Sequence, residues 1–418
     1  MVQPQSTEER EKEIQAGRHY CEMLPIEYVP TPKYMETYRE ALRHYAKPTA
    51  KAVGTLADKI MQKKGAHVVL VSLARAGTPI GILLKHFLRQ NYHLDVPHYS
   101  ISIIRGRGID QNAMKFLLGK YRPEDLLFVD GWVGKGAILR ELQKEISAYP
   151  GVSPELAVLA DPANVTELCG THEDILIPSS CLNCTVSGLV SRTFLRGDII
   201  GENDFHGAVY YGELEHADLS YNFIEAIEKE FSFQKCTGEG LPAGRGGLKS
   251  RTGTGEGLSA GREGLKFRTG TGAALAVGSM MAEGKNGMPV NRAKEPAAKL
   301  GMDEGESHKS LGIDEGKSHK SLGIDERKSH KNLGIDEVKQ IAREFGITDI
   351  NLVKPGIGET TRVLLRRVPW KVLVRQDCKN DKSLAHILRL AEEKNVPVAY
   401  YPLKHYKSCG IIKKLADA

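Results

Sequence analysis

Apolar residues in the first part of the chain follow two alternating patterns. Helical spacing of apolar positions predicts helices over 33–45, 50–64, 78–90 and 136–147. Short, nearly continuous apolar runs predict buried strands at 67–72, 99–104, 126–129 and 156–159. Strands that alternate with helices are typical of an α/β fold with a doubly wound parallel sheet.

A second patterned segment begins at about residue 333. Its apolar spacing predicts helices over 337–345, 359–366, 382–394 and 403–416, and strands over 349–353, 371–375 and 397–400. These elements predict a small α-β-α sandwich.

Repeats separate the two patterned segments. A 17-residue unit at 238–254 recurs at 255–271, and an 11-residue unit occurs three times in succession over 300–332. Each short unit has too few apolar residues to stack as a solenoid, so a disordered linker is expected. There are two alternatives to a disordered linker. The 11-residue units could form a marginal helix, or their repeated histidines, His308, His319 and His330, could bind a metal ion. The predicted division is a polar N-terminal tail (1–20), an α/β domain (21–234), a repeat linker (235–332) and a C-terminal domain (333–418).

The composition narrows the class of protein. Of 418 residues, 41% are hydrophobic and 26% are charged, as in ordinary soluble proteins. No apolar run reaches the roughly 18 residues of a membrane span, and the polar start has no signal-peptide pattern, so a cytoplasmic protein without a membrane partner is expected. Seven scattered cysteines favour reduced thiols. A net charge of +6 permits an anionic partner.

The candidate chemistry begins with the loop that follows the strand at 126–129. Ligands of doubly wound sheets bind at the carboxyl ends of the strands, where this loop lies. Three glycines let its backbone approach an anion closely, and Lys135 adds a positive charge; the glycines are Gly131, Gly134 and Gly136. Asp130 can accept hydrogen bonds from ribose hydroxyls. The spacing excludes a nucleoside triphosphate P-loop, and the alternative is an ordinary strand-turn-helix connection.

Two further loops follow predicted strands and carry positive charge. Arg75, Ala76 and Gly77 open the helix after the strand at 67–72 and form a second candidate anion cradle. Arg105 and Arg107 lie in a glycine-containing loop that could close over a polyanionic substrate and exclude water. The alternative for this last loop is a solvated basic turn.

The order of these loops resembles that of a type I phosphoribosyltransferase. The resemblance implies a pyrophosphate loop at 73–81, a flexible hood at 103–110 and a phosphoribosyl-pyrophosphate loop at 130–137, to which Trp132 and Ala137 also belong. It implies attack on the ribose anomeric carbon by an unknown base, with pyrophosphate leaving and with Mg²⁺ bound to the substrate and contacting Asp130 indirectly. Here Gly131 and Trp132 stand beside Asp130 where the family has a second acid.

Segments 130–137, 177–183 and 204–207 are similar to bacterial StiP-type proteins, which resemble phosphoribosyltransferases, occur with tellurite and stress-response genes, and carry a cysteine-protease label. That label implies a thiol hydrolase in which Cys181 is the nucleophile, His206 or His216 the general base and Asp204 or Asp218 its orienting partner. A helix at 182–190 would lower the pKa of the thiol. The alternatives are an inert core thiol and, with Cys184, half a zinc site or a redox pair.

The C-terminal segment carries a glycine-rich turn and a basic helix. Gly358, Glu359, Thr360, Thr361 and Arg362 are followed by Arg366. The segment resembles the RNA-binding module of pelota, the peptide release factors and kink-turn-binding ribosomal proteins, which implies that these six residues contact RNA. A dimerising or scaffold domain is the alternative.

The leading hypothesis is a phosphoribosyltransferase-like enzyme of a bacterial stress response that makes a nucleoside-like product and carries an RNA-binding domain. The rivals are the thiol hydrolase and a non-catalytic, nucleotide-sensing RNA-binding protein.

Overall fold

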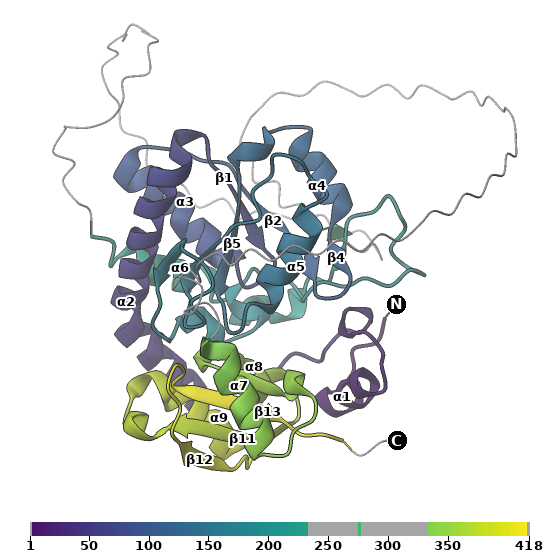
Figure 1. The fold of residues 1–418 in the computed structure, drawn as a ribbon, viewed down its shortest axis with the longest axis vertical. Helices are drawn as coiled ribbons and strands as arrows, with labels where there is room; N and C mark the ends of the chain where they lie inside the picture. Colours follow the sequence, from purple (N-terminus) through teal and green to yellow (C-terminus); the bar gives the residue numbers. More distant parts are fainter. Residues whose placement is uncertain (1, 233–274, 277–332, 416–418) are drawn as a thin grey trace, which may run out of the picture. The chain divides into compact units, whose positions relative to one another are not determined.

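A computed structural model describes residues 2–232, 275–276 and 333–415 (Figure 1). The predicted linker, its two kinds of repeat and the three repeated histidines lie outside the described residues, apart from the short strand β9 (Leu275–Ala276). This strand pairs with β8 (Gly207–Ala208).

The N-terminal domain is built on a five-stranded parallel sheet. Its strand order is β2-β1-β5-β6-β7. The strands are β1 (Val69–Leu73), β2 (His98–Ile101), β5 (Leu126–Trp132), β6 (Leu156–Ala160) and β7 (Cys169–Thr171). The chain moves outward to β2 on one side of β1 and to β5 on the other, so the strand order reverses between β1 and β5. Ligands of such sheets bind at this switch point.

Helices cover both faces of this sheet. One face carries α2 (Pro32–Lys64), α3 (Thr78–Tyr92) and α6 (Ser220–Glu228), which pack on Leu70 and Leu127. The other carries α4 (Gln111–Leu118) and α5 (Ala137–Ile146), which pack on Val71 and Phe128. The predicted doubly wound parallel sheet is therefore confirmed.

Two helical predictions differ from the structure near the N-terminus. The helices expected over 33–45 and 50–64 form one helix, α2, which continues through Pro48. The expected polar tail contains α1 (Thr7–Gln15), which begins at a capping box of Ser6 and Glu9. Local capping, without an apolar face, is what made this helix hard to predict.

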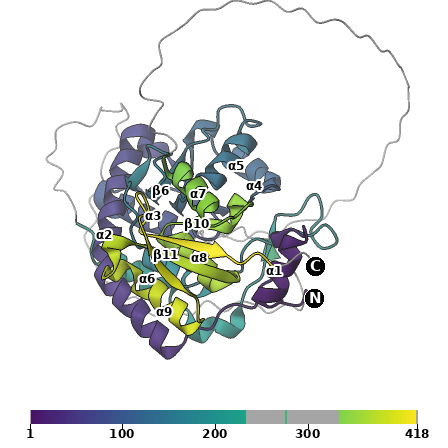
Figure 2. The same cartoon turned by 60° about the horizontal axis from the view of Figure 1, so that its bottom comes forward.

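The C-terminal domain is a four-stranded sheet between helices. The order β10-β13-β11-β12 joins β10 (Val353–Pro355), β13 (Ser408–Ile412), β11 (Pro369–Arg375) and β12 (Val398–Tyr401). One face is covered by α7 (Leu333–Glu344), and the other by α8 (Ile357–Arg366) and α9 (Ala385–Glu393). Figure 2 shows α7 and α9 on opposite sides of β11. The α-β-α sandwich is as predicted.

The final helix predicted over 403–416 is wrong. Residues Ser408–Ile412 form β13, a strand buried along its whole length between β10 and β11. Gly410 lets α8 approach closely, because a Cβ atom there would lie 3.2 Å from the Cα atom of Thr360. The short segment 408–412, with three apolar residues between Lys407 and Lys413, fits either a buried strand or one face of a helix, and packing against α8 decides between them.

Within the described residues, no helix combines the length and apolar character needed to cross a bilayer. The six cysteines described there are all free and buried.

Candidate functional site

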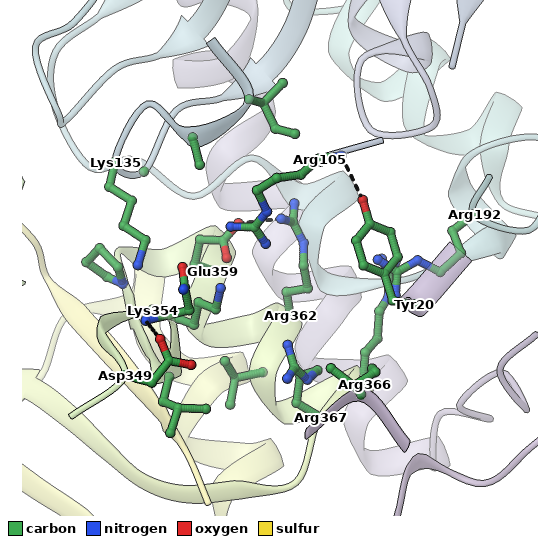
Figure 3. Close-up of a pocket in the computed structure, with 18 of the residues that line it drawn as sticks. Tyr20, Arg105, Lys135, Arg192, Asp349, Lys354, Glu359, Arg362, Arg366 and Arg367 are labelled. Atoms are coloured by element: carbon green, nitrogen blue, oxygen red, sulfur yellow. Dashed lines mark hydrogen bonds and ion pairs between the residues drawn. The ribbon is translucent and has the colours of Figure 1, made fainter. Parts of the chain in front are cut away.

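A cavity of about 760 Å³ lies where the loop after β5 meets α8 (Figure 3). Its walls include residues 132–137 at the switch-point side of the N-terminal sheet, the end of α1, and α8 of the C-terminal domain. The predicted phosphate loop and the predicted RNA-binding helix therefore form two walls of the same cavity.

The cavity is lined by far more positive than negative side chains. The acids are Asp130, Asp349 and Glu359. Nine lysines and arginines also line it: Lys12, Arg105, Lys135, Arg192, Lys354, Arg362, Arg366, Arg367 and Lys414. Figure 3 shows Arg105 and Arg362 pointing toward one another from opposite walls. Such a concentration of like charge in a concave, partly desolvated space attracts polyanions.

The protonation of these groups reflects burial and mutual repulsion. Burial, together with the nearby cations Arg105 and Lys135, lowers the pKa of Lys354 to about 7, although Glu359 opposes the fall. Burial likewise lowers the pKa of Arg192, although a guanidinium remains charged at neutral pH. Burial opposes ionisation of Glu359, yet the surrounding cations hold the pKa of its carboxyl below the ordinary value. A bound anion would relieve this repulsion.

Asp130 lies at the end of β5 and faces the cavity. Burial raises the pKa of its carboxyl to about 6. One carboxylate oxygen accepts a hydrogen bond of 2.7 Å from the backbone N–H of Gly131, and the other is left for a ligand hydroxyl. Lys135 is less available, because its ammonium donates to the carbonyl oxygens of Ile350 and Val353 at 3.0 and 3.1 Å.

Close contacts fix the phosphate loop against the C-terminal domain. The ring of Trp132 lies over Gly356 and Gly358, and a Cβ atom at Gly356 would be 2.2 Å from the ring. The hydroxyl of Tyr406 donates to the carbonyl oxygen of Gly134 at 2.7 Å. The residues of the C-terminal domain in these contacts lie at the start of α8 (Gly356 and Gly358) and just before β13 (Tyr406). The cavity therefore depends on the contact between the two domains.

The structure brings many of the predicted site residues together at this cavity. From the N-terminal domain these are Asp130, Trp132, Gly134, Lys135, Gly136, Ala137 and Arg105. From the predicted RNA-binding segment they are Glu359, Arg362 and Arg366. The sequence placed these two groups in separate sites, and the structure joins them.

Other predicted site residues do not line the cavity; they are Arg75, Ala76, Gly77, Arg107, Gly131, Gly358, Thr360 and Thr361. Arg75 forms a buried ion pair with Glu27 at 3.3 Å, so the predicted second anion cradle is already closed by a carboxylate. Arg107 pairs with Glu22 at 2.8 Å, and half of its side chain is exposed.

Two of the remaining residues are held inside the C-terminal domain. Thr361 is buried and donates its hydroxyl to the carbonyl oxygen of Ile357 at 2.7 Å. Thr360 is also buried and accepts a hydrogen bond from Ser408 at 3.1 Å. These threonines support α8 and are not presented to a ligand.

The sequence analysis missed several cavity residues. Arg192 stacks over the ring of Tyr20, 4.6 Å from its centroid, and both line the cavity with His19. Lys354 and Arg367 complete the basic lining. These residues belong to short turns, to the three-residue strand β10 or to the end of α8, all far apart in the chain, so local sequence carries no signal that joins them.

Cys181 is placed as a core thiol. It ends a short 3₁₀ turn (Pro178–Cys181), and a second turn (Cys184–Val186) replaces the helix predicted at 182–190. The predicted lowering of its pKa is wrong, since complete burial raises the pKa. His206 shares a hydrogen bond of 2.8 Å with Ser102, while His216 lies in the 3₁₀ helix Gly212–Ala217.

Two other cysteines do contact histidines. In the described part of the chain, ring nitrogens lie within hydrogen-bonding distance of sulfur at Cys21 and Cys169. Nδ1 of His19 is 2.9 Å from Cys21, and Nε2 of His172 is 3.4 Å from Cys169. Burial raises the pKa of Cys21 to about 11. His19 lines the cavity, so the Cys21 pair borders the same site.

No cluster of three or more histidine, cysteine, aspartate or glutamate side chains suitable for a metal ion occurs among the described residues. A zinc site built on Cys181 and Cys184 is thus not seen there. Any divalent cation at the cavity would take most of its ligands from the phosphates of a bound molecule, because residues 130–137 supply one carboxylate, Asp130.

The chain matches known protein families over both domains. Residues 1–228 match the family model described as "Tellurite-like stress resistance cysteine protease StiP". Residues 332–414 match that of the PELOTA RNA-binding domain. A curated relative from Acinetobacter baylyi, named "Cysteine protease StiP", is 28% identical over 426 residues, which cover 99% of this chain and 90% of the relative.

Two crystal structures of a Bacillus anthracis hypoxanthine-guanine phosphoribosyltransferase also match, one of them with a HEPES molecule in its active site. Their sequences are 16% and 15% identical to this chain. Each match covers 33% of this chain and 81% or 80%, respectively, of the matched chain, with a TM-score of 0.23 in both cases. Scores this low carry no argument about fold or function. The match of the StiP model to more than half of the chain decides the family. The chain belongs to the StiP family of tellurite-like stress resistance cysteine proteases.

Proposed function

We propose that the cationic cavity binds phosphoribosyl pyrophosphate and that the protein transfers the phosphoribosyl group to a base. The observation that supports this most is the convergence of nine lysines and arginines on a glycine-rich loop at the switch point of a parallel sheet. A polyphosphorylated sugar matches that site in charge, and a cavity of about 760 Å³ is large enough to hold it together with a base.

The proposed roles follow from the positions of the side chains. Arg105 and Arg362 neutralise the diphosphate from opposite walls, and the backbone N–H groups at residues 134–137 receive the sugar phosphate. Asp130 accepts hydrogen bonds from the ribose hydroxyls. The bond between the anomeric carbon and the diphosphate oxygen breaks, a bond from that carbon to a base nitrogen forms, pyrophosphate leaves with the electron pair, and the nitrogen proton passes to solvent.

Mg²⁺ is the expected companion of the diphosphate. Asp130 is the one carboxylate that residues 130–137 supply, and its free oxygen accepts from the ribose hydroxyls, so the cation is carried by the substrate rather than held by the protein alone. When bound with the substrate, the ion neutralises part of the charge on the leaving diphosphate.

Pyrophosphate release from phosphoribosyl pyrophosphate, with Mg²⁺ and a panel of bases, tests this proposal. Wild type and Cys181→Ala are expected to release pyrophosphate at similar rates, whereas Asp130→Asn is expected to be slower by about a hundredfold. Loss of activity in Cys181→Ala alone would contradict the proposal. Tight binding without release in any variant would instead indicate a non-catalytic nucleotide sensor.

A cysteine hydrolase is the second candidate, and it is the one that the family description supports. Of the described cysteines, Cys21 suits that activity better than Cys181, because His19 contacts its sulfur and borders the cavity. Cleavage of a casein substrate by wild type and Cys181→Ala, but not by Cys21→Ala, would support a protease with this dyad. Loss of cleavage in Cys181→Ala alone would assign the activity to Cys181.

RNA is the proposed partner of the C-terminal domain, because residues 332–414 match the PELOTA RNA-binding model. Arg362 and Arg366 supply positive charge from α8. Phosphate-led binding predicts that RNA affinity falls as salt rises.

A further inference from the structure

The N-terminus of α8 is closed by a carboxylate from the N-terminal domain. The two oxygens of Asp174 lie 3.1 and 3.3 Å from the backbone nitrogen of Ile357, the first residue of α8. One of them also accepts from the backbone N–H of Lys407 at 2.8 Å. Asp174 is buried, with 4% of its surface exposed. Two backbone donors of the C-terminal domain are therefore occupied by a negative charge from the other domain.

A carboxylate at a helix N-terminus occupies the position in which a phosphate would bind. Free N–H groups and the helix dipole favour an anion there, whether it is a side chain or a nucleic-acid phosphate. Trp132 covers the same end of the helix, 3.7 Å from where a Cβ atom of Gly358 would lie. The first turn of α8 is thus shielded from RNA while the two domains are docked.

The next turns of α8 face the cavity. Arg362, Arg366 and Arg367 line it together with the phosphate loop. Each has a partner in the docked state: Arg362 pairs with Glu359, Arg367 pairs with Glu11 of α1, and Arg366 donates a hydrogen bond to the side-chain oxygen of Asn183. The cations that RNA phosphates would use are therefore the same ones that complete the small-molecule site. One set of arginines cannot serve both ligands at once.

We propose that RNA and the phosphorylated small molecule are mutually exclusive ligands of α8: the docked state holds the small polyanion, and RNA binds only when α8 separates from Asp174 and Trp132. The proposal rests on the proposed function for the identity of the small ligand. Its RNA part rests on the match of the C-terminal domain to the PELOTA RNA-binding model and on the docking contacts.

Fluorescence anisotropy of a labelled kink-turn RNA tests the docking contacts first. Asp174→Ala removes the carboxylate that closes α8, so RNA is expected to bind about tenfold more tightly than to wild type. Asp198→Ala is the matched control, because it removes the same charge from an exposed aspartate that pairs with Arg196. Trp132→Ala is a second opening variant in case Asp174→Ala does not fold.

Equal RNA affinity in wild type and both opening variants, or no RNA binding by any of them, would overturn the proposal. So would a gain in Asp198→Ala equal to that in Asp174→Ala, because general electrostatics would then explain the effect.

Competition between RNA and a small polyanion is the second experiment. Inorganic pyrophosphate with Mg²⁺, added at constant ionic strength, is expected to weaken RNA binding to wild type in proportion to its concentration. Simultaneous binding of both at unchanged affinity would contradict mutual exclusion. If calorimetry shows that neither pyrophosphate nor phosphoribosyl pyrophosphate binds, the proposed function fails, while the Asp174→Ala result still decides whether docking shields α8 from RNA.

Discussion

The hydroxyl of Tyr406 donates a hydrogen bond of 2.7 Å to the carbonyl oxygen of Gly134, and so ties the C-terminal domain to the phosphate loop. Tyr406 is fully buried. Tyr406→Phe keeps the ring and leaves the carbonyl without this donor, so the free energy of unfolding is expected to fall by about 1 to 2 kcal/mol. Urea unfolding measures this change.

Tyr401→Phe is a suitable control, because it removes another tyrosine hydroxyl, one that donates to Glu344 within the C-terminal domain. Pyrophosphate affinity is expected to fall in Tyr406→Phe and not in Tyr401→Phe. An equal effect of the two variants on ligand binding would show that the contact with Gly134 does not shape the loop.

Asp174 gives the docking of the domains a predicted pH dependence. Burial raises the pKa of its carboxyl from 3.8 to about 6, despite hydrogen bonds from Lys407 and Ile357 and the charges of Lys407 and Arg375, which oppose the rise. Because the folded-state pKa is raised, the stabilisation from this group is complete below about pH 3.8 and is lost as pH rises through about 6.

Unfolding of wild type and Asp174→Asn across this range isolates the effect. The stability of wild type relative to Asp174→Asn is expected to fall by on the order of 3 kcal/mol between pH 4 and pH 7.5, since a tenfold change in proton affinity corresponds to about 1.4 kcal/mol. A difference that stays constant with pH would mean that folding does not shift the pKa of Asp174.

Thiol labelling separates the cysteine hypotheses. Burial raises the pKa of Cys181, so iodoacetamide is expected to alkylate the native protein at Cys181 at least about a hundredfold more slowly than the unfolded chain. Peptide mapping by mass spectrometry after timed labelling reports the rate at each cysteine. Rapid alkylation of Cys181 in the native protein would contradict its placement as a core thiol and would restore it as a candidate nucleophile.

Much of the N-terminal fold followed from local pattern. Buried parallel strands have continuous apolar runs, and the eight residues 130–137, at the end of β5 and in the loop after it, hold three glycines and Lys135. The sheet and one wall of the cavity were therefore predictable. The predicted strand at 126–129 ended too early, because β5 continues through the polar Asp130 to Trp132.

The other wall was not predictable, because it depends on docking between segments far apart in the chain. Lys135 and Ile350 are 215 residues apart, and no periodic pattern connects them. Arg75 shows the converse: its loop has the composition of an anion cradle, but Glu27, 48 residues earlier, fills it. Composition of one loop cannot reveal which distant side chain occupies it.

The most direct test of the central claim, that both domains build one polyanion site, is calorimetric titration of phosphoribosyl pyrophosphate with Mg²⁺ into three proteins. Arg362→Ala removes a cation of α8 from the cavity, and Arg122→Ala removes an exposed arginine that pairs with Asp125 elsewhere. We expect binding to wild type and Arg122→Ala with equal affinity, and a loss of about tenfold to a hundredfold in Arg362→Ala. Unchanged affinity in Arg362→Ala, or no binding to wild type, would contradict the claim.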